Sequence, residues 1–120
     1  MADDNADAVL LVAARAGREG EVAALLAAGA NPHAVHHVDG SSALYLASQE
    51  GHLDVVDQLL AAGAEVDGAN AGGWTPLSIA SEFGHVEVVE ILLAFGANSH
   101  AVNRKGASAL CIASQGGDVT

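Results

Sequence analysis

Three histidines lie close together in the sequence and could form part of a metal site. His33, His36 and His37 fall within a stretch of five residues. Imidazole is a common zinc ligand, but zinc sites combine histidines with cysteines or carboxylates at defined spacings. The histidine spacing here matches no strong zinc pattern, and the single cysteine, Cys111, lies far along the chain. The sequence therefore predicts no metal site and no cofactor.

The remaining reactive side chains do not form a catalytic group. Serines, histidines and acidic residues recur at regular intervals, and the chain has no glycine-rich phosphate-binding loop. Cys111 lies on an apolar helical pattern, which predicts a buried and unreactive thiol. His52 and His85 each follow a glycine at equivalent positions, and we expect them to link the two helices on either side. The sequence thus predicts a protein that is not an enzyme.

The charge balance restricts the partners that the chain can have. Fifteen acidic residues are set against four basic ones, for a formal net charge of −11 over 120 residues. Such a surface repels phosphate backbones and anionic lipids, so we expect a neutral or basic protein partner and no nucleic acid. No apolar run approaches the roughly 18 residues of a membrane span, and the acidic start is unlike a secretory leader. We expect an intracellular protein, cytoplasmic or nuclear.

The regular spacing comes from an internal repeat of 33 residues. Residues 74–97 read WTPLSIASEFGHVEVVEILLAFGA, and residues 41–64 read SSALYLASQEGHLDVVDQLLAAGA. Residues 107–120 follow at the same interval, and residues 10–30 align after one extra loop residue. The repeat predicts one domain with units at about 4–36, 37–69 and 70–102 and a truncated unit at 103–120.

Each unit carries the signals of two short helices. Thr75 is suited to cap a first helix that begins at Pro76, and Ser42 and Ser108 occupy the same cap position. Glycines such as Gly84 are expected to end the helices, because a helix often stops at a residue with a left-handed backbone conformation. The apolar stripe of the second helix is predicted from Val86, Val89, Leu92 and Leu93. Since no unit can bury its apolar face alone, we expect neighbouring units to stack through small alanines.

The repeated motif resembles the ankyrin repeat over nearly the whole chain. The resemblance rests on Thr75-Pro76-Leu77, Gly84-His85, Val88-Val89, Leu92-Leu93 and Gly96-Ala97. It implies an all-α solenoid of stacked antiparallel helix pairs joined by hairpin-like loops, or fingers. The sequence departs from the motif where Tyr45, Ser78 and Cys111 replace a histidine, and where Ala43 and Ala109 replace a proline. We expect Tyr45 to pack between adjacent units with its hydroxyl on a polar neighbour.

The resemblance also implies where a partner protein binds, because ankyrin partners contact the finger tips and the concave face of the first helices. The matching tip positions are Val38, Asp39, Ser41, Ala71, Gly72, Trp74, Arg104, Lys105 and Ala107. The matching helix positions are Gln49, Glu50, Glu82, Phe83, Gln115 and Gly116. The motif gives neither Trp74 nor Phe83 a core role, so both are predicted as binding anchors, while Phe95 is expected to be an ordinary surface residue. In the alternative interpretation, the Trp74 indole packs over a neighbouring finger.

Several functions remain open at this point. The leading hypothesis is a protein-interaction module, monomeric or part of a longer array. The chain stops where a second helix of the fourth unit should begin, which suggests instead the targeting or regulatory portion of a larger enzyme or channel. A structural spacer is a third interpretation. Some ankyrin domains are hydroxylated at the loop position held here by His33, Asp67 and His100, but we expect ordinary loop hydrogen bonding there.

Overall fold

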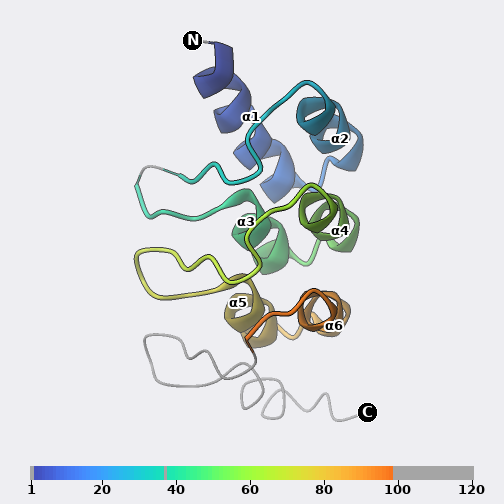
Figure 1. The fold of residues 1–120 in the computed structure, drawn as a ribbon. Helices are drawn as coiled ribbons and strands as arrows, with labels where there is room; N and C mark the ends of the chain where they lie inside the picture. The colour runs from blue at the N-terminus through green and yellow to red at the C-terminus, as the bar shows by residue number, and fades with distance from the viewer. Residues whose placement is uncertain (1, 37, 99–120) are drawn as a thin grey trace.

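The computed structural model describes residues 2–36 and 38–98, which form three antiparallel helix pairs stacked in a row (Figure 1). The pairs are α1 (Ala2–Ala16) with α2 (Glu19–Ala27), α3 (Ala43–Glu50) with α4 (Leu53–Ala61), and α5 (Pro76–Glu82) with α6 (Val86–Ala94). Two long loops project to one side of the row, and α2, α4 and α6 lie on the other side. The all-α stack of helix pairs predicted from the sequence is confirmed.

The first helices begin where the sequence signals place them. The Thr75 hydroxyl accepts a hydrogen bond from the Ser78 amide at 3.1 Å, and the Ser78 hydroxyl accepts one from the Thr75 amide at 2.8 Å. This reciprocal capping box satisfies two amides that the helix itself leaves without partners. In α3 the Ser42 hydroxyl accepts from the Tyr45 amide at 3.0 Å. The predicted caps at Thr75 and Ser42 are therefore confirmed, and Ser78 completes the first of them.

The core runs through all three pairs because each first helix packs on the next. Helix α3 contacts both α1 and α5. Equivalent leucines and alanines of these helices are at most 1% exposed: Leu10, Leu44, Leu77, Ala13, Ala47 and Ala80. Burying one leucine side chain contributes about 2 kcal/mol, and the alanines let the helices approach closely. Stability therefore comes from contacts between neighbouring pairs, as expected for a repeat protein.

The predicted apolar stripe of α6 is partly wrong. Val88 and Leu92 are buried, whereas Val86 and Leu93 are each 39% exposed. Helix α4 has a second helix on each side, but α6 packs against α4 alone among the described second helices. Leu60, which occupies in α4 the position of Leu93, is only 6% exposed for this reason. The repeat pattern marks equivalent positions but not how many neighbours cover them.

Two buried serines in the first helices have hydroxyl groups that are expected to lower the stability of the fold. Ser48 and Ser81 are 0% and 2% exposed, and neither hydroxyl has a hydrogen-bond partner within the described ranges. Ala14 fills the equivalent position of α1. Because each serine buries a polar oxygen without a partner and lowers helix propensity, Ser48→Ala or Ser81→Ala should raise the free energy of unfolding by about 1 kcal/mol. Urea unfolding followed by circular dichroism measures this change.

Ser78 provides the matched control because it is also fully buried but its hydroxyl completes the capping box. Ser78→Ala should lower the free energy of unfolding by about 1 kcal/mol. A loss of stability in Ser48→Ala similar to that in Ser78→Ala would contradict the prediction.

Candidate partner-binding surface

The first finger, residues 35–42, is a short hairpin-like loop. Val35 pairs with Ser42 in an antiparallel bridge, and the His36 amide donates to the Ser41 carbonyl at 2.8 Å. Gly40 allows the turn because its φ is +72°, a conformation that favours glycine. At the tip, the Asp39 carboxylate accepts from the Ser41 amide at 3.0 Å, and this bond lowers the Asp39 pKa below its ordinary value. Asp39 therefore presents a charged, exposed carboxylate.

The second finger, residues 68–75, is held in shape by one asparagine side chain. The Asn70 amide oxygen accepts from the backbone amides of Gly72 at 2.9 Å and Trp74 at 3.1 Å. The backbone amide of Ala71 donates to the Asp39 carbonyl at 2.8 Å, which joins the two fingers. The fingers therefore form a continuous row along one side of the stack, as Figure 1 shows.

Tyr45 of α3 is buried beneath the two fingers and interacts with the second of them. Its side chain is 7% exposed, and burial raises its pKa, while a side-chain hydrogen bond with Asn70 of the second finger acts in the opposite direction. The tyrosine of one unit thus reaches an asparagine of the next. The prediction that Tyr45 packs between units with its hydroxyl on a polar neighbour is confirmed.

Two of the predicted tip residues are less accessible than the sequence suggested. Ser41 is only 1% exposed, and its hydroxyl lies 3.5 Å from the Asn70 side-chain nitrogen, between the fingers. The expectation that Ser41 lies on the open tip is therefore wrong. Trp74 is half-buried and packs against the hydrophobic core, so the expectation that it has no core role is also wrong. The indole is therefore packed in part, but on the core, whereas the alternative interpretation placed it over a neighbouring finger.

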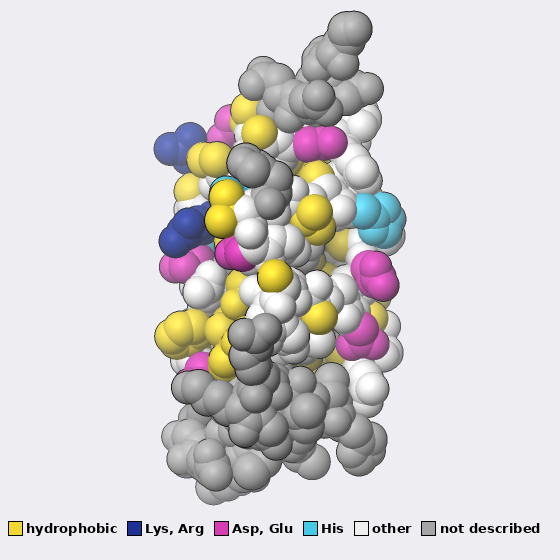
Figure 2. Space-filling model, turned by 90° about the vertical axis from the view of Figure 1, so that its left-hand side faces the viewer, with side chains coloured by type: hydrophobic (Ala, Val, Ile, Leu, Met, Phe, Trp, Pro, Cys, Tyr) yellow, Lys and Arg dark blue, Asp and Glu magenta, His cyan; other side chains and the backbone are white. Residues whose placement is uncertain are grey.

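Phe83 is the most exposed of the aromatic residues that the structure describes. It is 55% exposed at the end of α5, and its ring centroid lies 6.3 Å from that of His85. Glu50 and Glu82 are exposed, and Gln49 is partly exposed, at the ends of α3 and α5. Figure 2 shows acidic and hydrophobic side chains on the finger side of the molecule, with basic side chains near its upper left edge.

The sequence analysis did not include Arg15 among the exposed residues at the ends of the first helices. Arg15 occupies in α1 the repeat position that Gln49 and Glu82 occupy in α3 and α5, and it is exposed. The alignment of residues 10–30 with the later units contained the signal, because that alignment places Arg15 opposite Gln49. Among the described helix ends, the first unit therefore adds a positive charge next to the acidic Glu50 and Glu82 of the following units.

Two histidines hold the row of helix ends in register. His52 Nε2 donates to the Arg15 carbonyl at 3.0 Å, and His85 Nε2 donates to the Gln49 carbonyl at 3.0 Å. Each ring therefore joins its own unit to the first helix of the preceding one. The backbones of these histidines also link the two helices of their own unit, as expected: the His52 amide donates to the Ala47 carbonyl, and the His85 amide donates to the Ala80 carbonyl. What the sequence did not predict is that the rings bond to the ends of α1 and α3 in the preceding units.

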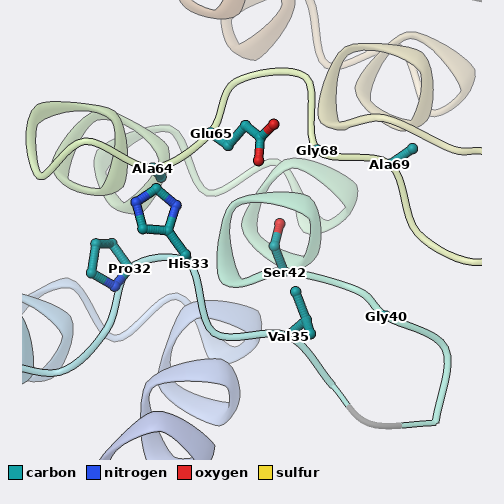
Figure 3. Close-up of a pocket in the computed structure, with 9 residues that line it drawn as sticks. All are labelled: Pro32, His33, Val35, Gly40, Ser42, Ala64, Glu65, Gly68 and Ala69. Carbon is teal, nitrogen blue, oxygen red and sulfur yellow. The ribbon is translucent and has the colours of Figure 1, made fainter.

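A small pocket lies between the loops that lead into the two fingers (Figure 3). His33 comes from one loop and Glu65 from the other, and the volume is about 130 Å³. Pockets that hold small organic ligands are roughly 300–1,000 Å³, so this one is too small for such a ligand. Across residues 2–36 and 38–98 no three His, Cys, Asp or Glu side chains are grouped closely enough to hold a metal ion.

The loop position considered for hydroxylation makes a structural hydrogen bond. Asp67 Oδ1 accepts from the Asn98 amide of the following loop at 2.9 Å. This is the ordinary loop hydrogen bonding that the sequence predicts for this position. His33 is exposed, and His100 lies outside the described residues.

Part of the predicted surface cannot be placed. The predicted contact residues Arg104, Lys105, Ala107, Gln115 and Gly116 lie outside the described residues, as does Cys111. Phe95 is 48% exposed, which confirms it as a surface residue. None of the helices in the described part of the chain is both long and apolar enough to cross a membrane.

Comparison with known proteins agrees with the helix-pair stack. The family model for ankyrin repeats (3 copies) matches residues 10–103 and 67–120, so the chain belongs to the ankyrin repeat family. Ankyrin repeats are in general protein-interaction modules and are typically non-catalytic.

The chain is also similar to a much larger protein, the glycerophosphocholine phosphodiesterase gde1 of Schizosaccharomyces pombe. The two are 37% identical over 75 residues, which is 62% of this chain. The aligned region is 7% of the length of that relative. The likeness therefore concerns a small part of the relative.

Proposed function

We propose that this chain binds another protein through its finger tips and the concave groove formed by the first helices, with Phe83 as the anchor. The observation that carries the proposal is the 55% exposure of Phe83 beside the exposed carboxylates of Glu50 and Glu82. Large aromatic side chains that become buried on binding contribute most to interface energies. A protein partner that presents an apolar side chain next to a lysine or arginine fits this arrangement.

The fingers supply the second half of the proposed surface. Asp39 adds a charged carboxylate at the tip of the first finger, and the bond from Ala71 to Asp39 holds the two tips together. A row that is fixed before binding loses less conformational entropy when a partner docks. Arg104 and Lys105, at the tip of the next predicted finger, remain part of the proposed surface. Val38, which is 76% exposed, adds an apolar contact.

Acidic surfaces of this kind also speed the approach of a basic partner and repel nucleic acid. The role proposed for the chain is therefore binding rather than catalysis, in the cytoplasm or nucleus.

Two phenylalanines of similar exposure allow a controlled test. Phe83→Ala should weaken partner binding by at least about 2 kcal/mol, roughly 30-fold, because it removes the anchor. Phe95→Ala removes a side chain that is 48% exposed on α6, away from the fingers, and should leave the affinity unchanged. Affinity capture with the intact gene product identifies the partner, and calorimetric titration of each variant gives the affinity. Equal effects of the two substitutions would remove the proposed anchor.

A second candidate function is suggested by the comparison with gde1. Because the matching region is 7% of a protein named as a phosphodiesterase, the present repeats can be the targeting or regulatory part of a larger enzyme. Sequencing the native transcript beyond Thr120 tests this candidate. A reading frame that continues into a catalytic domain supports it, and a stop codon directly after the repeats contradicts it.

A further inference from the structure

Helices α4 and α6 lie on the side of the stack opposite the fingers (Figure 1), and a groove lies between them. Its volume is about 440 Å³. It is lined by three residues of each helix: Leu53, Asp54, Asp57, Glu87, Glu90 and Ile91. Next to it is a hollow of about 360 Å³ that shares Leu53 and Glu87 and is otherwise lined by Gly51, Gly84, His85, Val86 and Val88. We call these two together the outer groove.

The outer groove has an aliphatic floor. Leu53 and Ile91 are partly buried against the hydrophobic core, and Val86 is 39% exposed. The floor therefore still exposes apolar surface to solvent. Covering such surface on binding contributes favourable free energy in proportion to its area.

Both rims of the outer groove are acidic. Asp54 and Asp57 are exposed on α4, and Glu87 and Glu90 are exposed on α6. In each pair the residues are three apart, so along each helix axis their separation is about 4.5 Å. Two parallel rows of carboxylates therefore flank the aliphatic floor.

A comparison of units within the chain shows that the helix stack does not require this aliphatic floor. Between α2 and α4, Glu19 stands at the position of Leu53, and Gln58 stands at the position of Ile91. Gly20 and Ala23 replace the two aspartates of the α4 rim. At the third floor position, that of Val86, the α2–α4 contact has the apolar Leu53. Because the helices pack there with polar residues at two of the three floor positions, the apolar side chains of Leu53 and Ile91 in the outer groove are not required by the stack.

Among the described residues, the charge that lines the outer groove is of one sign. Residues 37–102 contain no lysine and no arginine. The salt bridges found in the described ranges join Arg18 to Glu21 and His36 to Asp39, and neither involves a rim residue. Across those ranges the rim carboxylates are also not grouped closely enough to hold a metal ion. The outer groove therefore suits several cations spread along a segment rather than one bound ion.

We propose that the outer groove binds a basic amphipathic helix of a partner protein. Leucine-like side chains of that helix lie on Leu53, Val86 and Ile91, and its lysines or arginines meet the carboxylates of both rims. Helices recognised in grooves present apolar anchors at positions i, i+3, i+4 and i+7, and the two rims match a helix with basic residues on both sides of such a stripe. One end of the outer groove, at Gly84 and His85, lies next to Phe83, whose ring centroid is 6.3 Å from that of His85. The proposal rests on the floor and rims between α4 and α6 and does not depend on the function proposed for Phe83.

A designed peptide of roughly 15 residues, long enough to form a helix, tests the proposal. It carries a leucine stripe at helical spacing flanked by lysines and arginines, and its shuffled version has the same composition and charge. Titration of the isotope-labelled chain, followed by amide chemical shifts, gives both affinity and location. We expect the helical peptide to shift amides of α4 and α6 and to bind at least about tenfold more tightly than the shuffled one.

Two double substitutions each remove two negative charges, one pair from the rims of the outer groove and one pair from elsewhere on the surface. They therefore test whether the position of the lost charge matters for peptide binding. Asp57→Asn with Glu90→Gln should weaken the peptide about three- to tenfold, because two rim carboxylates are lost. Asp39→Asn with Glu65→Gln, which removes the same charge from the first finger and from the loop after α4, should leave its affinity within twofold. Val86→Ser should also weaken binding, since it removes apolar floor.

Each contrary result overturns the proposal. Equal binding of the shuffled peptide would mean that only net charge attracts it, and shifts confined to the fingers would place the site elsewhere. Equal effects of the two charge-matched double variants, or no binding of the helical peptide, would also overturn it. None of these results bears on Phe83→Ala, so failure here is distinguishable from failure of the proposed function.

Discussion

Gly51→Ala is expected to lower the free energy of unfolding by about 3 kcal/mol, because two costs fall on one position. Gly51 ends α3 with φ at +76°, where an L-residue with a Cβ is less stable by about 1–2 kcal/mol. A Cβ added there would also lie 2.7 Å from the His85 ring. The ring would have to move and give up its hydrogen bond to Gln49, which adds about 1–2 kcal/mol. Denaturant unfolding measures the total.

Gly63 provides the control for Gly51. It also has a positive φ, +94°, but a Cβ there would meet no atom within 4 Å. Gly63→Ala should therefore show the backbone cost alone. The Gly51→Ala, His85→Ala double variant should lose less free energy of unfolding than the two single variants lose together. The reason is that the ring that the new methyl group would displace is already absent. Equal losses for Gly51→Ala and Gly63→Ala would show that the close approach of His85 contributes nothing.

Leu59→Ala is expected to cost about 3 kcal/mol and to separate the unfolding of the outer units. Leu59 is 0% exposed in α4, the second helix that contacts both α2 and α6. Truncation removes buried methyl groups and leaves a cavity that closely packed helices cannot fill completely. Because repeat stacks are stabilised by nearest-neighbour contacts, a defect in the middle unit should also reduce cooperativity. Calorimetry should show a lower and broader transition.

Leu93→Ala is the matching control because the same side chain is removed from α6, where it is 39% exposed. The expected loss is below about 1.5 kcal/mol, since less apolar surface returns to water. A loss as large as that of Leu59→Ala would mean that Leu93 is covered in solution, and would restore the apolar stripe first predicted for α6.

Much of the local structure could be predicted from the sequence because it depends on a few neighbouring residues. The caps at Ser42 and Thr75 follow from side-chain oxygens within three residues of the amides that they bind. The helix ends at Gly51 and Gly84 follow from the need for a positive φ. The repeat spacing then fixed which elements are equivalent, and hence the row of helix pairs.

The accessibility of the candidate site could not be predicted with the same success. Ser41, Trp74 and Phe83 were assigned to one surface from their repeat positions alone. Ser41 is buried by contacts with the second finger, and Trp74 packs on the core, while Phe83 stays open. For Ser41 the difference arises from a residue in the next unit, Asn70, whose side chain also holds the second finger in shape.

The sequence by itself determined the identity of the building unit: two short helices with capped starts, glycine ends and an apolar pattern that repeats. These features are local, since each depends on residues within about one or two helical turns. Only the tertiary structure decided which equivalent side chains are covered. It buried Leu60 but exposed Leu93, and it opened an aliphatic groove between α4 and α6. The physical reason is that burial depends on what the adjacent unit places against a side chain, and a repeat motif specifies the position but not its neighbours.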